Sequence, residues 1–290
     1  MFLLLVLYLL TSFSFIINKE SLFFASPFFL VGLRLLIAGS LLLIYYSVFR
    51  KQKIVIKRKD WWIFLVVAFF GAFITNSFDM WGLRYIYAAK VSLIYMLSPF
   101  FGALLSYIFF KEKLSLSKLF GLFFGLAGLF ILLVEKGGAI YNFSLAEIAV
   151  VIATFTTVVG WIAMKDLVNS RSYSPILVNG ISLSLGGCFS MLTSLFVESW
   201  RPLPVSNGLY CITFVIAAAL VAHIISYNLY AFLLKKYTVS LMTFAGFSAP
   251  IFTAILGYFF LGETVPKTFL ISLIMIFVGM YFFYKDELKG

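Results

Sequence analysis

One sequence pattern decides the fold and occurs twice: SPFFGALLSYIFFKE at residues 98–112 and APIFTAILGYFFLGE at residues 249–263. Each copy has a proline in second place, an apolar stretch, and a glutamate at the end. Pro99 and Pro250 are separated by 151 residues, and Glu112 and Glu263 have the same separation. A shared offset for two landmarks indicates an internal repeat.

Further landmarks extend the repeat over both halves of the chain. Gly128 recurs as Gly279 at the same offset of 151 residues. Upstream, three landmarks recur at an offset of 148 residues, namely Pro27, Gly32 and Gly39 as Pro175, Gly180 and Gly187. We therefore predict two repeats, residues 1–140 and residues 141–290.

The composition places these repeats in a membrane. Hydrophobic residues make up 63% of the 290 residues and charged residues only 11%, whereas about 25% of a soluble domain is charged. A membrane span needs about 20 apolar residues as a helix. The sequence contains ten candidate spans, at about 2–17, 28–48, 61–80, 88–110, 117–134, 145–164, 174–197, 208–232, 239–261 and 267–284.

The positive charges predict the orientation of the spans. Of the 22 Lys and Arg residues, fifteen fall in one set of alternate loops and five in the other. Lys and Arg concentrate on the cytoplasmic side, so both termini should be cytoplasmic, in the cell (inner) membrane. Five spans per repeat is an odd number, so the second copy enters the membrane upside down. The predicted fold is an all-α polytopic membrane protein of ten transmembrane helices in two inverted five-helix repeats.

This architecture is typical of secondary transporters, which bind a substrate between the repeats. The net charge of +11 is spread over short loops rather than one face, which argues against nucleic acid as a partner. With a single His, and Asp79 the one acid clearly within a span, neither a metal site nor an enzyme is expected. No cofactor is expected. The sequence has no phosphate-binding loop motif, so transport is not expected to be driven directly by ATP. A channel is the other alternative, and a saturable flux stimulated by counter-transport would distinguish a carrier from it.

The two prolines also mark the expected substrate site. Pro99 and Pro250 lie near the middle of the fourth and ninth spans, where proline should break the helix and free the carbonyls of Tyr95 and Gly246. Paired interruptions in the two halves indicate a binding site. We therefore predict that Tyr95, Ser98 and Pro99 in the first repeat, and Gly246 and Pro250 in the second, bind the substrate. A kink that only packs against neighbouring helices is the alternative.

Polar residues within other spans complete the candidate cavity, because ionisable groups within membrane spans usually face the interior of the helix bundle. The substrate-binding candidates outside the two interruptions are Asn76, Trp161, His223, Tyr227 and Asn228. His223 could bind substrate, carry a proton or bond a neighbouring helix.

Three charged residues within or beside spans have other expected roles. Asp79 and Lys90, together with His223, are candidates for gating or coupling. Asp79 could instead pair with Arg84 or Lys90 at the outer interface. Arg34 is expected to extend its long side chain toward the membrane surface.

Small residues in the fifth span predict a close helix contact. Gly121, Gly125 and Gly128 form a face that lets this helix approach a neighbour or a second subunit. The chain is therefore expected to be a monomer or a homodimer, with the lipid bilayer and a small-molecule substrate as its partners.

These features resemble the drug/metabolite transporter superfamily, specifically its EamA type. The matching residues are Lys19 and Arg34 in the first two spans, Ser98-Pro99 with Lys111-Glu112, and Ala249-Pro250 with Gly262-Glu263. The resemblance covers essentially the whole chain. It implies alternating access, a central cavity lined by spans 1, 3, 4, 6, 8 and 9, and transport of amino acids or related small polar metabolites.

A narrower substrate is the alternative. The superfamily includes S-adenosylmethionine uptake systems of intracellular bacteria, which exchange it for S-adenosylhomocysteine. The 36 Phe residues and the abundance of Lys are typical of an AT-biased genome, which is common in such bacteria.

Overall fold

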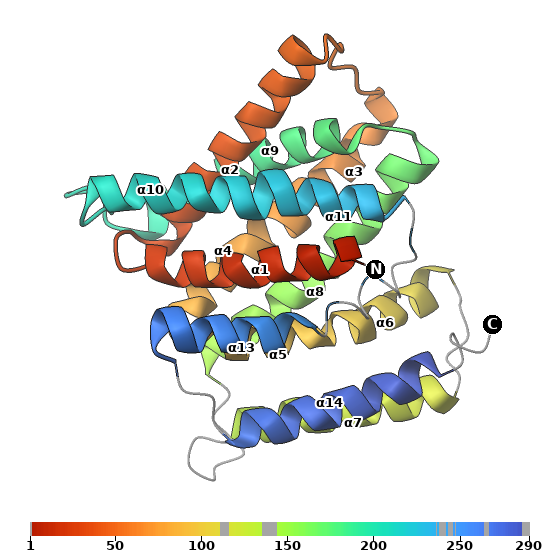
Figure 1. Cartoon of the computed structure of the whole chain (residues 1–290). Helices are drawn as coiled ribbons and strands as arrows, with labels where there is room; N and C mark the ends of the chain where they lie inside the picture. Colours follow the sequence, from red (N-terminus) through yellow and green to blue (C-terminus); the bar gives the residue numbers. More distant parts are fainter. Residues whose placement is uncertain are drawn as a thin grey trace.

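The structure, a computed structural model, describes residues 2–110, 116–134, 144–235, 237, 242, 246, 248–263 and 267–285 (Figure 1). The α-helices are α1 (Phe2–Ser21), α2 (Pro27–Ile44), α3 (Trp61–Val66), α4 (Thr75–Leu83), α5 (Ala88–Ile94), α6 (Ser98–Phe110), α7 (Leu116–Val134), α8 (Leu145–Lys165), α9 (Pro175–Val197), α10 (Gly208–Ala218), α11 (Tyr227–Leu233), α13 (Ser248–Leu261) and α14 (Lys267–Tyr284). Within the described residues the chain is helical and has no strand, apart from one isolated bridge between Ala25 and Val205.

Short non-α segments continue several of these helices. The π-helical segments are η1 (Tyr45–Phe49), η3 (Val67–Ile74), η5 (Asp166–Ser170) and η6 (Ala219–Ser226), and the 3₁₀ segments are η2 (Arg58–Asp60) and η4 (Tyr95–Leu97). π-Helical turns within α-helices are frequent at functional sites.

Among the described residues, six continuous helices are long and apolar enough to cross a membrane: Phe2–Ser21, Pro27–Phe49, Arg58–Leu83, Leu145–Ser170, Pro175–Val197 and Gly208–Leu233. They fall on six of the predicted spans. Shorter apolar helices occupy the fourth, ninth and tenth predicted spans. The ten-span count and the inverted repeat therefore remain predictions, and Glu112 lies outside the described residues.

Local sequence signals set where several helices begin. Pro27 and Pro175, matched landmarks of the repeat, each stand in the first turn of α2 and α9, where a missing N–H costs nothing. Ser144 and Glu147 form a capping box at the start of α8. The first span was predicted to end near residue 17, but α1 continues to Ser21. The Lys19 ammonium has carbonyl partners at 2.5 and 2.8 Å, on Leu83 and Ile86, so its charge does not end the helix.

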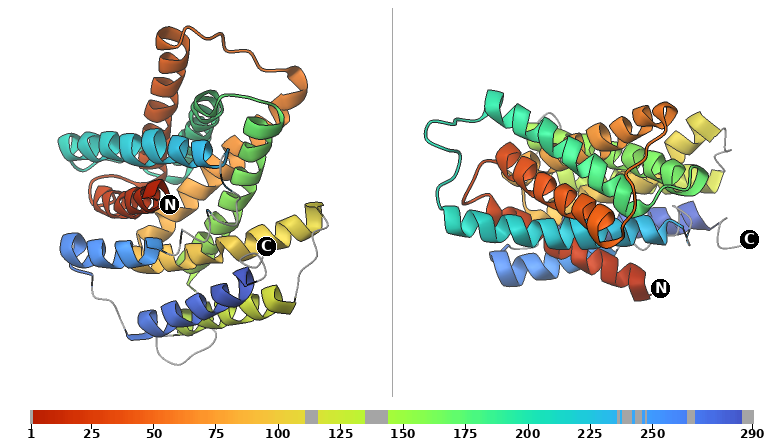
Figure 2. Two further views of the ribbon diagram at one scale, coloured as in Figure 1. Left: turned by 45° about the vertical axis from the view of Figure 1, so that its right-hand side comes forward. Right: turned by 90° about the horizontal axis from the view of Figure 1, so that it is seen from above.

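The helices pack in pairs that join distant parts of the chain. The most extensive contacts are between α2 and α9, and between α7 and α14. The second pair lies side by side at one edge of the bundle in both Figure 1 and Figure 2. Here Gly279 faces the backbone of Gly121 and Gly125, so the predicted small-residue face of the fifth span contacts α14.

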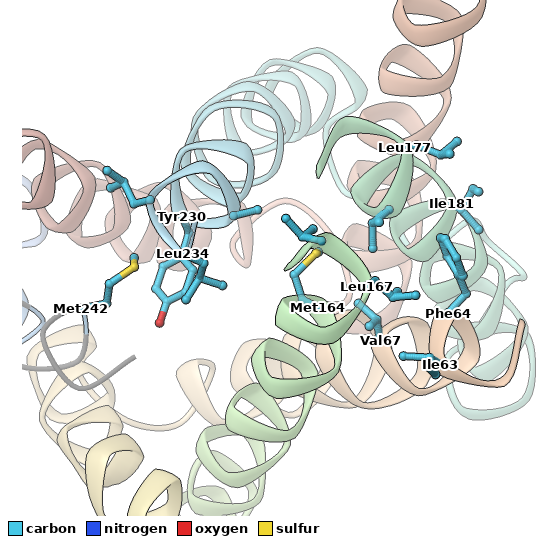
Figure 3. Close-up of a cluster of buried hydrophobic side chains, with 14 of the residues drawn as sticks. Ile63, Phe64, Val67, Met164, Leu167, Leu177, Ile181, Tyr230, Leu234 and Met242 are labelled. Carbon is cyan, nitrogen blue, oxygen red and sulfur yellow. The ribbon is translucent and has the colours of Figure 1, made fainter. Parts of the chain in front are cut away.

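Two buried apolar clusters lie toward opposite ends of the bundle. One gathers residues at the predicted outer end, including Ile16, Leu83 and Phe269. The other, shown in Figure 3, lies at the predicted cytoplasmic end and includes Phe64, Met164, Leu177 and Tyr230.

A polar network covers the second cluster at the same end. Asp60 accepts hydrogen bonds from Arg171 and from the Tyr173 hydroxyl at 2.8 Å. The Arg171 Nε also donates to Asp166 at 2.9 Å, and these bonds to Asp166 and Asp60 raise the pKa of Arg171 above its ordinary value.

Candidate functional site

A cavity of about 200 Å³ lies between the helices. Its lining comes from α1, α4, the α5–α6 region, α8, η6 and α11, Gly246 and α13. These elements belong to predicted spans 1, 3, 4, 6, 8 and 9, which are the spans that the family resemblance implied. Nine predicted site residues border it: Asn76, Asp79, Tyr95, Ser98, Pro99, Trp161, His223, Tyr227 and Gly246.

Arg34 supports the polar side of this cavity from behind. It is only 1% exposed and does not border the cavity itself. One Nη atom donates to the Asn18 amide oxygen and the other to the Asn76 amide oxygen at 3.2 Å. The expectation that Arg34 reaches for the membrane surface is therefore wrong. It stays inside because two other helices supply oxygen acceptors there.

Asn76 connects Arg34 to the second half of the chain. Its amide oxygen lies 3.2 Å from the His223 Nε2, and its amide nitrogen donates to the Tyr227 hydroxyl at 3.1 Å and to the Ala72 carbonyl at 2.8 Å. Because Arg34 has only donors, the Asn76 oxygen must face it. The His223 Nε2 must then carry a hydrogen to bond the same oxygen.

His223 thus makes the inter-helix bond that was one of its three expected roles. Its Nδ1 lies 3.3 Å from the Ala218 carbonyl, so both ring nitrogens face oxygen atoms. Substrate binding and proton transfer by His223 stay predictions.

Aromatic side chains from α8, η6 and α11 form a wall of the cavity next to Asn76. Trp161 stacks on Tyr230 with ring centroids 4.0 Å apart and meets Tyr227 edge-on at 5.3 Å. The His223 ring stacks on Tyr227 at 5.1 Å. We call Trp161, Tyr227, Tyr230 and His223 the aromatic wall. Such a surface suits a planar or cationic organic group.

Asp79 is the acid of the cavity. It lies one turn after Asn76 in α4, is 6% exposed, and lies near the Tyr95 hydroxyl. Its Oδ1 atom has no hydrogen-bond partner among the described residues. The expected pairing with Lys90 is not formed, because the Lys90 ammonium contacts Glu147 at 2.5 Å.

The prolines interrupt the helices without freeing the expected carbonyls. Before Pro99, α5 gives way to the 3₁₀ turn η4, and the Ser98 N–H donates to the Tyr95 carbonyl. Before Pro250, the Ala249 N–H donates to the Gly246 carbonyl at 2.9 Å. The prediction of free carbonyls at Tyr95 and Gly246 is wrong, since a tighter turn supplies a donor one residue before each proline.

Three predicted residues stand away from the cavity lining. The Asn228 amide oxygen accepts from Asn179 at 3.1 Å, Lys90 pairs with Glu147, and Pro250 lies in the first turn of α13. Conversely, Tyr8, Asn18, Ser92, Thr157 and Tyr230 border the cavity and were not predicted. A polar residue inside an apolar span was the available signal, but Ser and Thr also satisfy themselves on their own helix.

A clamp of charged side chains holds the predicted outer end of the bundle. Lys19 binds the carbonyls that end α4 and its following turn, and both Glu263 carboxylate oxygens accept from the Ala88 N–H at 3.0 and 3.1 Å. We call Lys19, Ala88 and Glu263 the outer clamp. It joins the turn at residues 84–87 to both ends of the chain.

Long apolar helices around an interior cavity that holds a few buried polar side chains are typical of membrane transport proteins. The sequence profile of the EamA-like transporter family matches residues 1–134 and 144–285. The chain therefore belongs to the EamA-like transporter family, within the drug/metabolite transporter superfamily.

Similar proteins agree with this assignment. An S-adenosylmethionine/S-adenosylhomocysteine transporter of Chlamydia muridarum is 27% identical over 282 residues, which cover 95% of this chain and 88% of the relative. A protein of the same name from Chlamydia trachomatis serovar L2 is 26% identical over 282 residues, 95% of this chain and 86% of the relative. One solved structure covers 100% of this chain and 97% of its own with a TM-score of 0.68, and at 18% identity it shows the fold alone.

Proposed function

We propose that this transporter carries small amino-acid-derived metabolites across the cell (inner) membrane by alternating access, and that it exchanges S-adenosylmethionine for S-adenosylhomocysteine. The observation that carries this proposal is the match to the chlamydial transporters over 95% of the chain. The cavity supports it, because it combines a buried acid with an aromatic wall. An adenosyl amino acid offers an ammonium group to the buried acid and a planar base to the aromatic wall.

The packing supports the proposed two repeats, residues 1–140 and 141–290, and the loop charges support cytoplasmic termini. If each span is exchanged for the one five places away, the observed contacts map onto one another. The contact of α1 (span 1) with α13 (span 9) corresponds to the contact of α8 (span 6) with η4 and α6 (span 4). The contact of η3 and α4 (span 3) with α8 (span 6) corresponds to the contact of α10 and η6 (span 8) with α1 (span 1). The pairs α2–α9 and α7–α14 map onto themselves. Inverted repeats that enclose a site are the basis of alternating access.

Counterflow in proteoliposomes tests the proposal. Labelled S-adenosylmethionine is added outside vesicles that contain S-adenosylhomocysteine, an amino-acid mixture or buffer alone. Exchange predicts accumulation only with the adenosyl compound inside, and saturation at high external concentration separates a carrier from a channel. No uptake above empty liposomes by folded protein would reject this substrate pair. Stimulation by the amino-acid mixture alone would favour amino acids instead.

A further inference from the structure

Asp79 borders the cavity and has an unpaired hydrogen-bond acceptor. The side chain borders the cavity, is only 6% exposed, and has no partner for Oδ1 among the described residues. Buried polar atoms are almost always paired, and a carboxylate is the most costly kind to leave open. The missing partner is therefore expected to be a group that enters the cavity.

Arg34 does not supply that partner. Its two Nη atoms already donate to Asn18 and Asn76, and among the described residues its Nε has no hydrogen-bond partner either and no salt bridge joins Arg34 to Asp79. The guanidinium acts on Asp79 only as a nearby charge. The Tyr95 hydroxyl lies near the carboxylate, and Oδ1 remains without a partner among the described residues.

The unpaired Oδ1 of Asp79 discriminates between the two cationic groups of S-adenosylmethionine, its ammonium and its sulfonium. An ammonium has three N–H donors, whereas a sulfonium carries charge without any donor. Only the ammonium can satisfy a carboxylate oxygen by hydrogen bonding. The sulfonium needs only a polarisable or negative surface, and the aromatic wall offers one.

We propose that Asp79 binds the α-ammonium group of the substrate and so makes the transporter selective for compounds that retain a free amine. The inference rests on the proposed function and names a residue that decides its specificity. It also explains how one cavity accepts both exchange partners, because S-adenosylmethionine and S-adenosylhomocysteine share the ammonium and differ at sulfur.

The fold gives this ligand a direction. Asp79 follows Asn76 by three residues, about 4.5 Å along the helix axis toward the predicted outer end. Asn76 in turn bonds Tyr227 of the aromatic wall at 3.1 Å. The amino-acid end of the substrate would then face outward and the base would lie on the aromatic wall.

Binding to the purified full chain in nanodiscs tests the proposal. The probes are S-adenosylhomocysteine and its N-acetyl derivative, which keeps the base, sulfur and carboxylate but has no ammonium. The wild type should prefer the free amine about ten- to a hundred-fold, the range for one charge-assisted hydrogen bond. In Asp79→Asn this preference should fall to within about threefold, while the affinity for the N-acetyl probe stays nearly the same.

A matched variant and the possible outcomes separate this inference from the function beneath it. Asp166→Asn removes a carboxylate that pairs with Arg171 outside the cavity and should keep the full preference. Equal binding of both probes by the wild type, or equal loss for both probes in Asp79→Asn, would overturn the role of Asp79 and leave the exchange function standing. Failure of the folded wild type to bind S-adenosylhomocysteine would overturn the proposed substrate, and the inference with it.

Discussion

Arg34 determines the polar side of the cavity without touching the substrate space. Its guanidinium binds two amide oxygens from two other helices, and this fixes which way Asn76 points. With Asn76 in this orientation, its amide oxygen accepts a hydrogen bond from the His223 Nε2. Its amide nitrogen then donates to the Tyr227 hydroxyl. Arg34 is thus a positioning residue. A planar fork with separate donors is needed for this role, and lysine lacks it.

Arg34→Lys should therefore weaken substrate binding while the protein still folds. The charge is kept, but one of the two charge-assisted hydrogen bonds is lost, which corresponds to about 1.5–3 kcal/mol. We expect KM for exchange to rise about tenfold or more, with a smaller change in the maximal rate. Initial rates in proteoliposomes measure both quantities.

Arg171→Lys is the control for this change, because Arg171 pairs with Asp60 and Asp166 outside the cavity. It should leave KM within about twofold of the wild type. If Arg34→Lys changed only the maximal rate, or if both variants raised KM alike, the positioning role of Arg34 would be wrong.

Trp161 should contribute most to binding of the base. Stacking of a base on an aromatic side chain is worth about 1–3 kcal/mol, so Trp161→Ala should weaken S-adenosylhomocysteine binding about five- to a hundred-fold. Trp161→Phe should recover part of the loss. Trp62→Ala is the control, since Trp62 is 61% exposed on α3. Competition binding with the labelled ligand measures the effect, and an unaffected Trp161→Ala variant would remove the aromatic wall from recognition.

The sequence predicted most of the side chains that are unusual in an apolar helix, Asn18 excepted, and it missed those that are not. Asn76, Asp79 and His223 are evident because such groups are costly in a membrane. Ser92 and Thr157 border the cavity equally, but each also bonds a carbonyl on its own helix. The partners of Arg34 could not be predicted, because they depend on which helices become neighbours in three dimensions.

At the scale of elements, the repeated glycines are explained by one helix crossing. Gly32 and Gly39 of α2 face Gly187 and Gly180 of α9. A side chain at Gly39 would place its first carbon 2.5 Å from the Ser184 backbone nitrogen and 2.9 Å from the Gly180 carbonyl oxygen. Close backbone approach replaces hydrophobic burial as the source of helix association in lipid.

Gly39→Ala should accordingly destabilise the protein by about 1–3 kcal/mol, the usual cost of overpacking. The added methyl meets backbone atoms that cannot turn aside, so α2 and α9 must separate. Thermal unfolding in detergent measures the loss. Gly208→Ala is the matched control, because nothing lies within 4 Å of its added carbon, and its melting temperature should be unchanged. Equal melting temperatures for the two variants would contradict the close crossing.

Element boundaries were predictable where charge or proline marks them. Pro27 and Pro175 begin α2 and α9 as their positions indicate. The first span, predicted at about 2–17, extends as α1 to Ser21, and the Lys19 ammonium near its end is hydrogen-bonded to carbonyls of another helix turn. The turns before Pro99 and Pro250 were also misjudged, since a local 3₁₀ hydrogen bond replaces the one that proline removes.

For the whole molecule, the outer clamp joins segments from both ends of the chain at the predicted outer end. Lys19 in α1 and Glu263 after α13 both hold backbone groups around the turn that joins α4 to α5. These contacts link segments from both ends of the chain at the predicted outer face. Alternating access requires this face to separate when the substrate enters from outside. The clamp should therefore stabilise the conformation that is closed to the outside, and its removal should shift the population toward the open one.

Glu263→Ala tests this shift through the accessibility of the cavity. In a background with Cys188 and Cys211 replaced by Ser, a cysteine at Ser92, which is buried and borders the cavity, reports opening by its reaction with a membrane-impermeant maleimide. Loss of the bonds to the Ala88 N–H should raise the labelling rate from outside at least about fivefold. Glu198→Ala is the control, because Glu198 likewise binds the Phe28 and Phe29 N–H groups at the start of α2, but it takes no part in the clamp. A general loosening of the outer face would raise labelling in both variants, whereas a gate at the clamp raises it in Glu263→Ala alone.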